Sequence, residues 1–477
     1  MNNNKSIKTI NTLYVFILFV LGIYFGKIRS ELFDGADRLY EAIAFKHNFF
    51  GHYRFSTAIN GILPWIIAQL GGSPEWILYG FILNYALTPA IVFLILRYYF
   101  KDEYLISFYL ISLSLFYTLT FFHPNHDILI GFYYLTLLYS YLKHTSPDNK
   151  YYYVVVFILC ILLSFTHLTQ IPCAIVLLVY LNIYQKKDYP VLKIGSLLGI
   201  AVLIKVLFFS SGYEKGIIFR ILEFKDRLEG LLYSPLIITF IRSFYTINIV
   251  VTGVLILTSY LLIKAHQKRL LFFIVAHMLL TLLYITFFFP EYPYTFGTEG
   301  YLKGANILLS IAFLDFFLYH ATVSQRIKTV VLGSIYAVTL IIILLNGINY
   351  KIYYNNLKQI ANNLNKNTIY VSPGAEKLEH YYILHRHTAL INTTENDKCY
   401  YFQYISDSTN YINEVLANDI KNNKLCFGEK AEMAIPDTET KRVLDKQYFL
   451  IFDLTNLKTR FRFNEYTYHN VTNTKKK

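Results

Sequence analysis

The chain has 477 residues and a formal net charge of +13; 55% of its residues are hydrophobic and only 16% are charged. A soluble domain carries about 25% charged residues, so this composition excludes an ordinary soluble protein. The basic residues lie largely in short connections between apolar segments. Membrane topology and anionic lipid headgroups account for them there, which excludes a nucleic-acid-binding function as well.

Apolar windows recur along the chain as far as residue 348. A helix of about 17–25 residues crosses the hydrocarbon core of a bilayer, so these windows predict an α-helical polytopic membrane protein with about eleven transmembrane helices. The helices are expected near residues 11–27, 76–100, 103–122, 128–142, 151–166, 170–185, 191–210, 244–264, 270–289, 304–320 and 329–348. Charged residues follow the first window in place of a cleavage site, so it is read as a retained signal anchor.

The charges of the connections predict the orientation. With a cytoplasmic N-terminus, every cytoplasmic connection is basic, as the positive-inside rule requires. The odd helix count then places the C-terminal region outside, and we expect a multi-pass protein of the bacterial inner (cytoplasmic) membrane. Residues 1–348 form the transmembrane domain, with an outer loop at 28–73 and interfacial helices near 56–70 and 216–233.

Residues 349–477 are predicted to form a small periplasmic α+β domain. Short β-like runs at 368–371 and 448–452 accompany a helical stretch around 376–385. The sequence His385-Arg386-His387 lacks a convincing metal-ligand spacing and is read as a solvated helix end.

The cysteines fall into two pairs. Cys160 and Cys173 lie in apolar windows and are expected to act as small hydrophobic residues. Cys399 and Cys426 lie in the C-terminal region, where they either form a disulfide in an oxidising compartment or remain two free thiols.

The densest group of ionisable residues in an outer segment is LFDGADRLYEAIAF at 32–45. Asp34 and Asp37 lie three residues apart and share one face of a helical turn, so they can act as a general base or bind a divalent cation. No other cofactor is expected. The alternative is that Asp34 and Gly35 open a helix, which is the commoner use of Asp.

The arrangement of the first half resembles the GT-C glycosyltransferases, in particular the dolichyl- or undecaprenyl-phosphate-dependent mannosyl and aminoarabinose transferases. DRLYEAIA at 37–44 looks like their outer-loop motif, an acidic pair followed by Tyr and Ala. The segment 71–100 looks like their second spanning helix with its Gly-rich entry, and VFILCILLSFTHLTQ at 156–170 resembles their short paired helices. The likeness covers roughly residues 1–190 by pattern and the remainder by topology.

This resemblance implies an inverting transfer of a hexose or pentose from a polyprenyl-phosphate donor to an acceptor at the outer face. Asp37 is then the base and Asp34 its partner. Asp127, with His126, stands at the start of the fourth helix like the family's second outer-loop acid and orients the acceptor. The alternative for this position is a helix N-cap formed by Asn125, which is equally compatible with the sequence.

The leaving phosphate needs cations, and the expected partners of the chain are a lipid-linked sugar donor and membrane lipids. The outer sequence GTEGYLKGAN stands where the family often has a basic entry to a helix, so Tyr301 and Lys303 are candidates. Arg54 and Lys205 are further candidates near the outer surface. Lys303 can equally be an anchor that reaches the lipid headgroups.

Two departures from the family keep other functions open. The family's second acid falls on Arg38, and its usual His-Pro-Pro reads His-Tyr-Arg at 52–54, so a non-catalytic scaffold subunit remains an alternative. A transporter or flippase for a lipid-linked saccharide is another, although it needs a polar pathway and most charges lie in loops. Of the ionisable residues inside apolar windows, His277 and Asp315 are exceptional, and Asp315 is read as structural.

Overall fold

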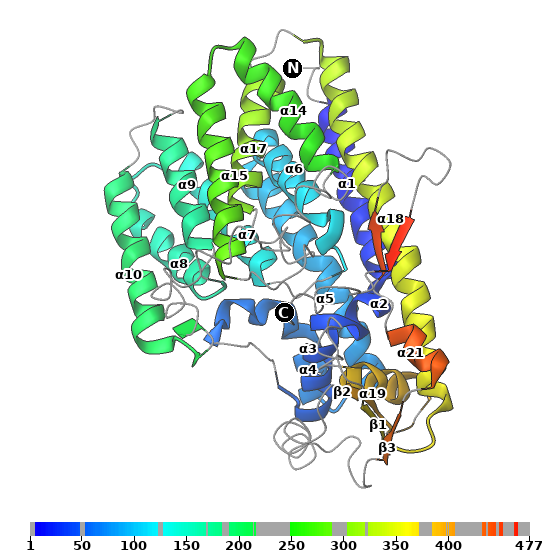
Figure 1. Cartoon of the computed structure of the whole chain (residues 1–477). Coiled ribbons are helices and arrows are strands. Elements are labelled where there is room, and N and C mark those ends of the chain that lie inside the picture. Colours follow the sequence, from blue (N-terminus) through cyan, green and yellow to red (C-terminus); the bar gives the residue numbers. More distant parts are fainter. Residues whose placement is uncertain are drawn as a thin grey trace, which may run out of the picture.

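The computed structural model shows a mostly helical chain with a small sheet at one end (Figure 1). It describes residues 5–47, 53–122, 127–167, 170–183, 190–212, 214–215, 249–288, 303–319, 323–371, 384–396, 398, 400–405, 432–435, 437–444, 448–451 and 462–465. The interfacial helix expected near 216–233 and the cysteines Cys399 and Cys426 lie outside these residues.

A helix occupies each of the predicted apolar windows. The helices of this part are α1 (Lys5–Tyr24), α2 (Gly26–Glu31), α3 (Phe33–Phe45), η3 (Phe55–Gly61), α4 (Ile62–Gln69), α5 (Pro74–Leu94), η4 (Ile95–Phe100), α6 (Glu103–Thr120), α7 (Asp127–His144), α8 (Tyr152–Ser164), α9 (Gln170–Ile183), α10 (Val191–Phe209), α14 (Ile249–Lys264), α15 (Lys268–Phe288), α17 (Lys303–Phe313), η5 (Leu314–Tyr319) and α18 (Gln325–Asn363). By length and composition, four described helical segments can cross a membrane, namely α1, α5 with η4, α10 and α18. The chain is therefore a helical membrane protein.

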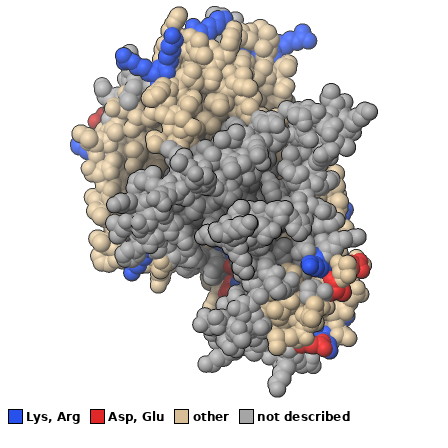
Figure 2. All heavy atoms as spheres, viewed as in Figure 1, with Lys and Arg blue, Asp and Glu red and all other residues tan. Residues whose placement is uncertain are grey.

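The first and last of these long helices run in the same direction. The Tyr336 hydroxyl donates to Asn11 Oδ1 over 2.9 Å, and the Tyr14 and Tyr336 rings stack with centroids 4.0 Å apart. Further along the chain in both segments, Tyr354 of α18 donates to Glu31 of α2, the short helix that follows α1. Because sequence numbers rise together along the two segments, the chain leaves α18 at the end of the bundle opposite its N-terminus (Figure 1). Lys and Arg side chains gather at the end where α1 and α18 begin (Figure 2).

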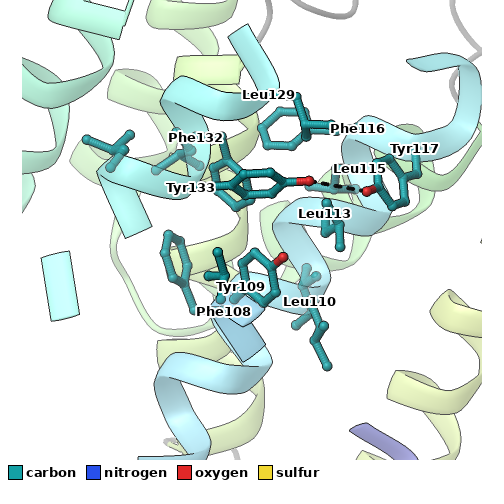
Figure 3. Close-up of a cluster of buried hydrophobic side chains, with 14 of the residues drawn as sticks. Phe108, Tyr109, Leu110, Leu113, Leu115, Phe116, Tyr117, Leu129, Phe132 and Tyr133 are labelled. Atoms are coloured by element: carbon teal, nitrogen blue, oxygen red, sulfur yellow. Dashed lines mark hydrogen bonds between the residues drawn. The ribbon is translucent and has the colours of Figure 1, made fainter. Parts of the chain in front are cut away.

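Aromatic residues fill the interior of the bundle, as Figure 3 shows for α6 and α7. The Phe108 and Tyr139 rings meet edge to face with centroids 5.1 Å apart, and the Tyr117 and Tyr133 hydroxyls lie 3.4 Å apart. Large buried rings supply apolar area, and edge-to-face pairs add specific geometry. This core holds the helix ends that carry the polar residues described below.

Asp315 lies in the π-helical turn η5 inside the bundle. Its carboxylate accepts from the Tyr104 hydroxyl at 2.7 Å and from the Tyr180 hydroxyl at 2.5 Å. Two hydroxyl donors from α6 and α9 offset the cost of placing a carboxylate there, and they tie η5 to both helices. These contacts agree with a structural reading of Asp315.

The C-terminal part is built on a three-stranded parallel sheet in the order β2-β1-β3. Its strands are β1 (Thr368–Val371), β2 (Phe402–Ile405) and β3 (Glu432–Ala434), and β4 (Tyr448–Ile451) pairs antiparallel with β5 (Arg462–Glu465). Two helices accompany them, α19 (Leu384–Glu395) and α21 (Thr438–Leu444). The strand predicted at 368–371 is thus present, whereas residues 376–383 of the helix expected around 376–385 lie outside the described residues.

The reading of His385–His387 as a solvated helix end is wrong. His385 and His387 are buried, and His385 Nδ1 lies 2.8 Å from Gln403 Oε1 of β2. The reason is that α19 packs between the sheet and α3, with contacts to both, and this packing encloses the two histidines of its first turn. The last spanning helix also runs past its predicted end at 348, and its extension to Asn363 contacts α19.

A buried polar network fastens α19 to the membrane part. Glu31 accepts hydrogen bonds from Tyr354 and from Thr394, the latter at 2.7 Å, and Glu395 forms ion pairs with Lys27 at 2.5 Å and with Lys358. Burial raises the pKa of the Glu31 carboxyl above its ordinary value. Burial opposes ionisation of Glu395 too, but hydrogen bonds from Lys27 and Lys358 outweigh it and lower the pKa of Glu395.

Candidate functional site

Among the residues that the structure describes, Asp127 lies at the centre of an ionic cluster at the end of the bundle that faces the sheet. It precedes the apolar span predicted at 128–142 and begins α7. Arg38 of α3 donates to Asp127 Oδ1 over 2.6 Å, and Arg54, which precedes η3, donates to Oδ2 over 2.5 Å. The exposed fractions of the three side chains are only 9%, 9% and 13% in the order Arg38, Arg54, Asp127. Charge-assisted bonds of this kind are strong when shielded from water.

Lys205 and Glu214 extend this cluster. Lys205 Nζ of α10 lies 3.0 Å from Glu214 Oε2 and donates to the carbonyl of Phe209 over 2.9 Å, while Arg54 Nε lies 3.7 Å from Glu214 Oε1. Glu214 is held by a reciprocal contact with Ser211, in which Ser211 N donates to Glu214 and Glu214 N donates to the Ser211 hydroxyl, both over 3.2 Å. This is the pattern of a helix capping box, and it fixes the carboxylate beside the two cations.

We call Arg38, Arg54, Asp127, Lys205 and Glu214 the outer ionic cluster, after the predicted outer segments that supply most of it. Its three cations lie around two carboxylates. Burial opposes ionisation of Asp127, but the charges of Arg38 and Arg54 outweigh burial and hold the pKa of this carboxyl below its ordinary value. Asp127 is therefore a fixed anion that orients two guanidinium groups, and a weaker proton acceptor than an isolated carboxylate.

Two glycines make the local packing possible. A Cβ on Gly35 would lie 2.2 Å from the carbonyl oxygen of Arg29, so only glycine lets α3 start against α2 and present Arg38. A Cβ on Gly131 would lie 2.4 Å from Cγ of Gln170, so glycine lets α7 approach α9. The second approach brings His167, whose charge also acts on Asp127, toward the cluster.

Of the residues predicted to carry function, the structure brings three together, namely Asp127, Arg54 and Lys205. Asp37 is not one of the residues of this cluster, and its carboxylate forms an ion pair with Arg386 of α19. Its helix starts after Leu32, which is the N-cap residue, so Asp34 lies in the first turn of α3.

The remaining predicted residues are not placed. His126 and Tyr301 lie outside the described residues, as does Asn125, the alternative cap of α7. Asp34 and Lys303 belong to α3 and α17, but their side chains are outside the described part. No group of three or more His, Cys, Asp or Glu side chains that could hold a metal ion occurs among the described residues.

Sequence reasoning missed three participants. Arg38 was counted as a departure from an acidic motif, yet its guanidinium group forms an ion pair with Asp127. Glu214 had a usable signal, since Ser211 and Glu214 have the Ser-x-x-Glu spacing of a capping box. Arg386 had none, because its partners Asp37 and Glu41 lie more than 340 positions away along the chain.

Comparison of the chain with protein-family models, with curated proteins and with solved structures gives no match. The site is therefore interpreted from its own chemistry.

Proposed function

We propose that the chain is a membrane glycosyltransferase that moves a sugar from a polyprenyl-phosphate donor to an acceptor at the outer face of the membrane. The observation that supports this best is the outer ionic cluster. Three cations from α3, the start of η3 and α10 converge with two carboxylates at one end of the bundle. Guanidinium and ammonium groups gathered in this way can bind a phosphate through charge-assisted hydrogen bonds.

In this proposal the donor phosphate binds at Arg54 and Lys205 and is the leaving group. The acceptor hydroxyl attacks the anomeric carbon, the bond from that carbon to the phosphate oxygen breaks, and the phosphate takes the electron pair. The acceptor proton passes to a carboxylate, for which Asp37 is the candidate, and the single displacement inverts the anomeric carbon. Cations that face the leaving phosphate stabilise the charge that grows in the transition state.

The proposed topology has eleven spans, a cytoplasmic N-terminus and a periplasmic C-terminal domain in the bacterial inner membrane. It is supported by the parallel course of α1 and α18 and by the basic side chains at the end where both helices begin (Figures 1 and 2). The ionic cluster and the sheet then share the outer side, where a lipid-linked donor presents its head group.

One observation favours a second candidate, a non-catalytic scaffold subunit that binds the same lipid phosphate. Two of the three acids predicted to serve catalysis are engaged in ion pairs, Asp127 with two arginines and Asp37 with Arg386. A flippase for a lipid-linked saccharide would use the same phosphate site. Release of polyprenyl phosphate from the donor distinguishes the enzyme from both alternatives, because neither of them breaks the bond between sugar and phosphate.

The proposal is tested with the full chain purified in detergent. Binding of a long-chain polyprenyl phosphate should be tighter than binding of the uncharged polyprenol by about tenfold or more, since that corresponds to one charge-assisted hydrogen bond of about 1.5 kcal/mol. Arg54→Gln should remove most of this difference, whereas Arg54→Lys keeps the charge and should retain part of it. Arg97→Gln, in η4 at the opposite end of the bundle, is the matched control, because Arg97 also forms an ion pair, with Glu103. Equal binding of phosphate and alcohol would overturn the proposal.

A further inference from the structure

Helix α3 connects the C-terminal domain to the outer ionic cluster. Asp37 and Glu41 are four residues apart and share a face, whereas Arg38 is rotated by about 100° from Asp37. The structure uses both faces. Arg386 of α19 forms ion pairs with Asp37 and with Glu41, the latter at 3.4 Å, while Arg38 reaches Asp127 over 2.6 Å. Neighbouring residues of one short helix therefore contact two different parts of the molecule.

The contact on the C-terminal side is specific. The guanidinium carbon of Arg386 lies 4.9 Å from the centre of the Tyr40 ring, so the side chain is held by two carboxylates and an aromatic face on the same helix. Its exposed fraction is 15%, and those of Asp37 and Glu41 are 27% and 14%. Partial shielding from water makes these pairs stronger than ordinary surface ion pairs.

The start of α3 is held as well. Gly35 packs against the carbonyl of Arg29, and Arg29 Nε donates to the carbonyl of Phe121 at the end of α6 over 2.8 Å. With its first turn fixed, α3 can respond to a change at Arg386 chiefly by tilting or rotating about that turn. Either movement displaces Arg38, because the side chain projects from the middle of the same helix.

We propose that the C-terminal domain sets the geometry of the outer ionic cluster through α3, with Arg386 as a positioning residue for Arg38. The ligand side of this proposal rests on the proposed function, since the cluster is taken to bind a phosphate. A displacement of about 1 Å at a charged ligand is enough to weaken binding or catalysis substantially. The contact of Arg386 with α3 is thus coupled to the affinity of a site that Arg386 is not proposed to touch.

The first test measures polyprenyl phosphate binding to the full chain in detergent. Arg386→Gln should weaken binding about tenfold, and Arg386→Lys, which keeps one charge for Asp37, should restore most of it. Lys358→Gln is the matched control, because it breaks an ion pair of the same domain interface at Glu395 without involving α3. Unchanged binding by Arg386→Gln, or an equal loss with Lys358→Gln, overturns the coupling.

The second test needs no ligand and so separates this proposal from the proposed function. Melting temperatures are compared for Arg386→Gln, Arg38→Gln and the double variant. Once Arg386 is lost, Arg38 should be poorly positioned and its removal should cost less, so the double variant should fall short of the summed losses by about 1 °C or more. Strictly additive losses overturn the proposal even if the wild-type chain binds phosphate. If that chain binds none, non-additive losses still support the coupling while the proposed function fails.

Discussion

The outer ionic cluster and the domain interface around Glu395 are both buried or half-buried charge networks, but different groups surround their carboxylates. In the cluster, three cations face the two carboxylates Asp127 and Glu214. At the interface, Lys27 and Lys358 pair with Glu395, and Glu31 receives two hydroxyl donors. The donors at the interface come from both parts of the chain, so this network fastens the two parts together. In the cluster, basic side chains from three elements converge beside the start of α7, which is the arrangement proposed to bind a phosphate. This contrast is the basis for assigning different functions to the two regions.

The largest expected effect is on stability and follows Asp127→Asn. The change leaves Arg38 and Arg54 buried without their shared anion, and breaking a buried pair typically costs about 3–5 kcal/mol. Unfolding of the detergent-solubilised chain should show a loss of this size, against almost none for Asp148→Asn in an exposed loop. A loss below about 1 kcal/mol would mean that the cluster is more hydrated than its burial indicates.

Asp37→Asn distinguishes two possible roles of Asp37 on α3, the helix that contacts both Arg386 and the cluster. If Asp37 is the base, transfer should fall roughly 100-fold or more, because general bases contribute about that much, and this loss should exceed the roughly tenfold loss of phosphate binding expected from the broken pair with Arg386. If Asp37 serves only to hold Arg386, transfer and phosphate binding should fall by the same factor. Sugar transfer is measured by incubating the chain with a lipid extract of the producing cells and following the release of polyprenyl phosphate by mass spectrometry.

Glu395→Gln should have a smaller effect that is confined to the interface. Its partners Lys27 and Lys358 have side chains 38% and 40% exposed, so water screens both ion pairs and the loss should be about 1 kcal/mol. Hydrogen exchange of the α19 amides should become several-fold faster, with no change in phosphate binding. An unchanged exchange rate would show that Glu31, Thr394 and Tyr354 hold α19 without Glu395.

The smallest expected effect is the pH dependence of the interface. Because burial raises the pKa of Glu31 in the folded chain, its contribution to the unfolding free energy is greatest below the ordinary value of 4.5 and declines as pH rises toward the raised pKa. Glu395 acts in the opposite sense, since its lowered pKa gives stability above 4.5 that is lost as pH falls. Melting temperatures of Glu31→Gln should lack the decline above 4.5, and those of Glu395→Gln should lack the loss below it. If the melting temperature of Glu31→Gln still declined above pH 4.5, the decline would have to come from another titrating group.

The sequence by itself determined the helices. Each predicted apolar window contains one, since window length and hydropathy are local properties that the bilayer thickness constrains directly. It also singled out Asp127, Arg54 and Lys205, because ionisable residues beside apolar spans are few. The eleven spans and their orientation remain predictions, with four spanning segments supported by length and composition among the described residues.

Only the tertiary structure decided which of these residues meet. Asp37 and Arg38 are neighbours in the sequence, but helical geometry sends one to Arg386 and the other to Asp127. The burial of His385 and His387 likewise depends on how α19 packs between the sheet and α3. Ion pairs between residues hundreds of positions apart leave no periodicity in a single sequence, because they arise from the packing of whole helices.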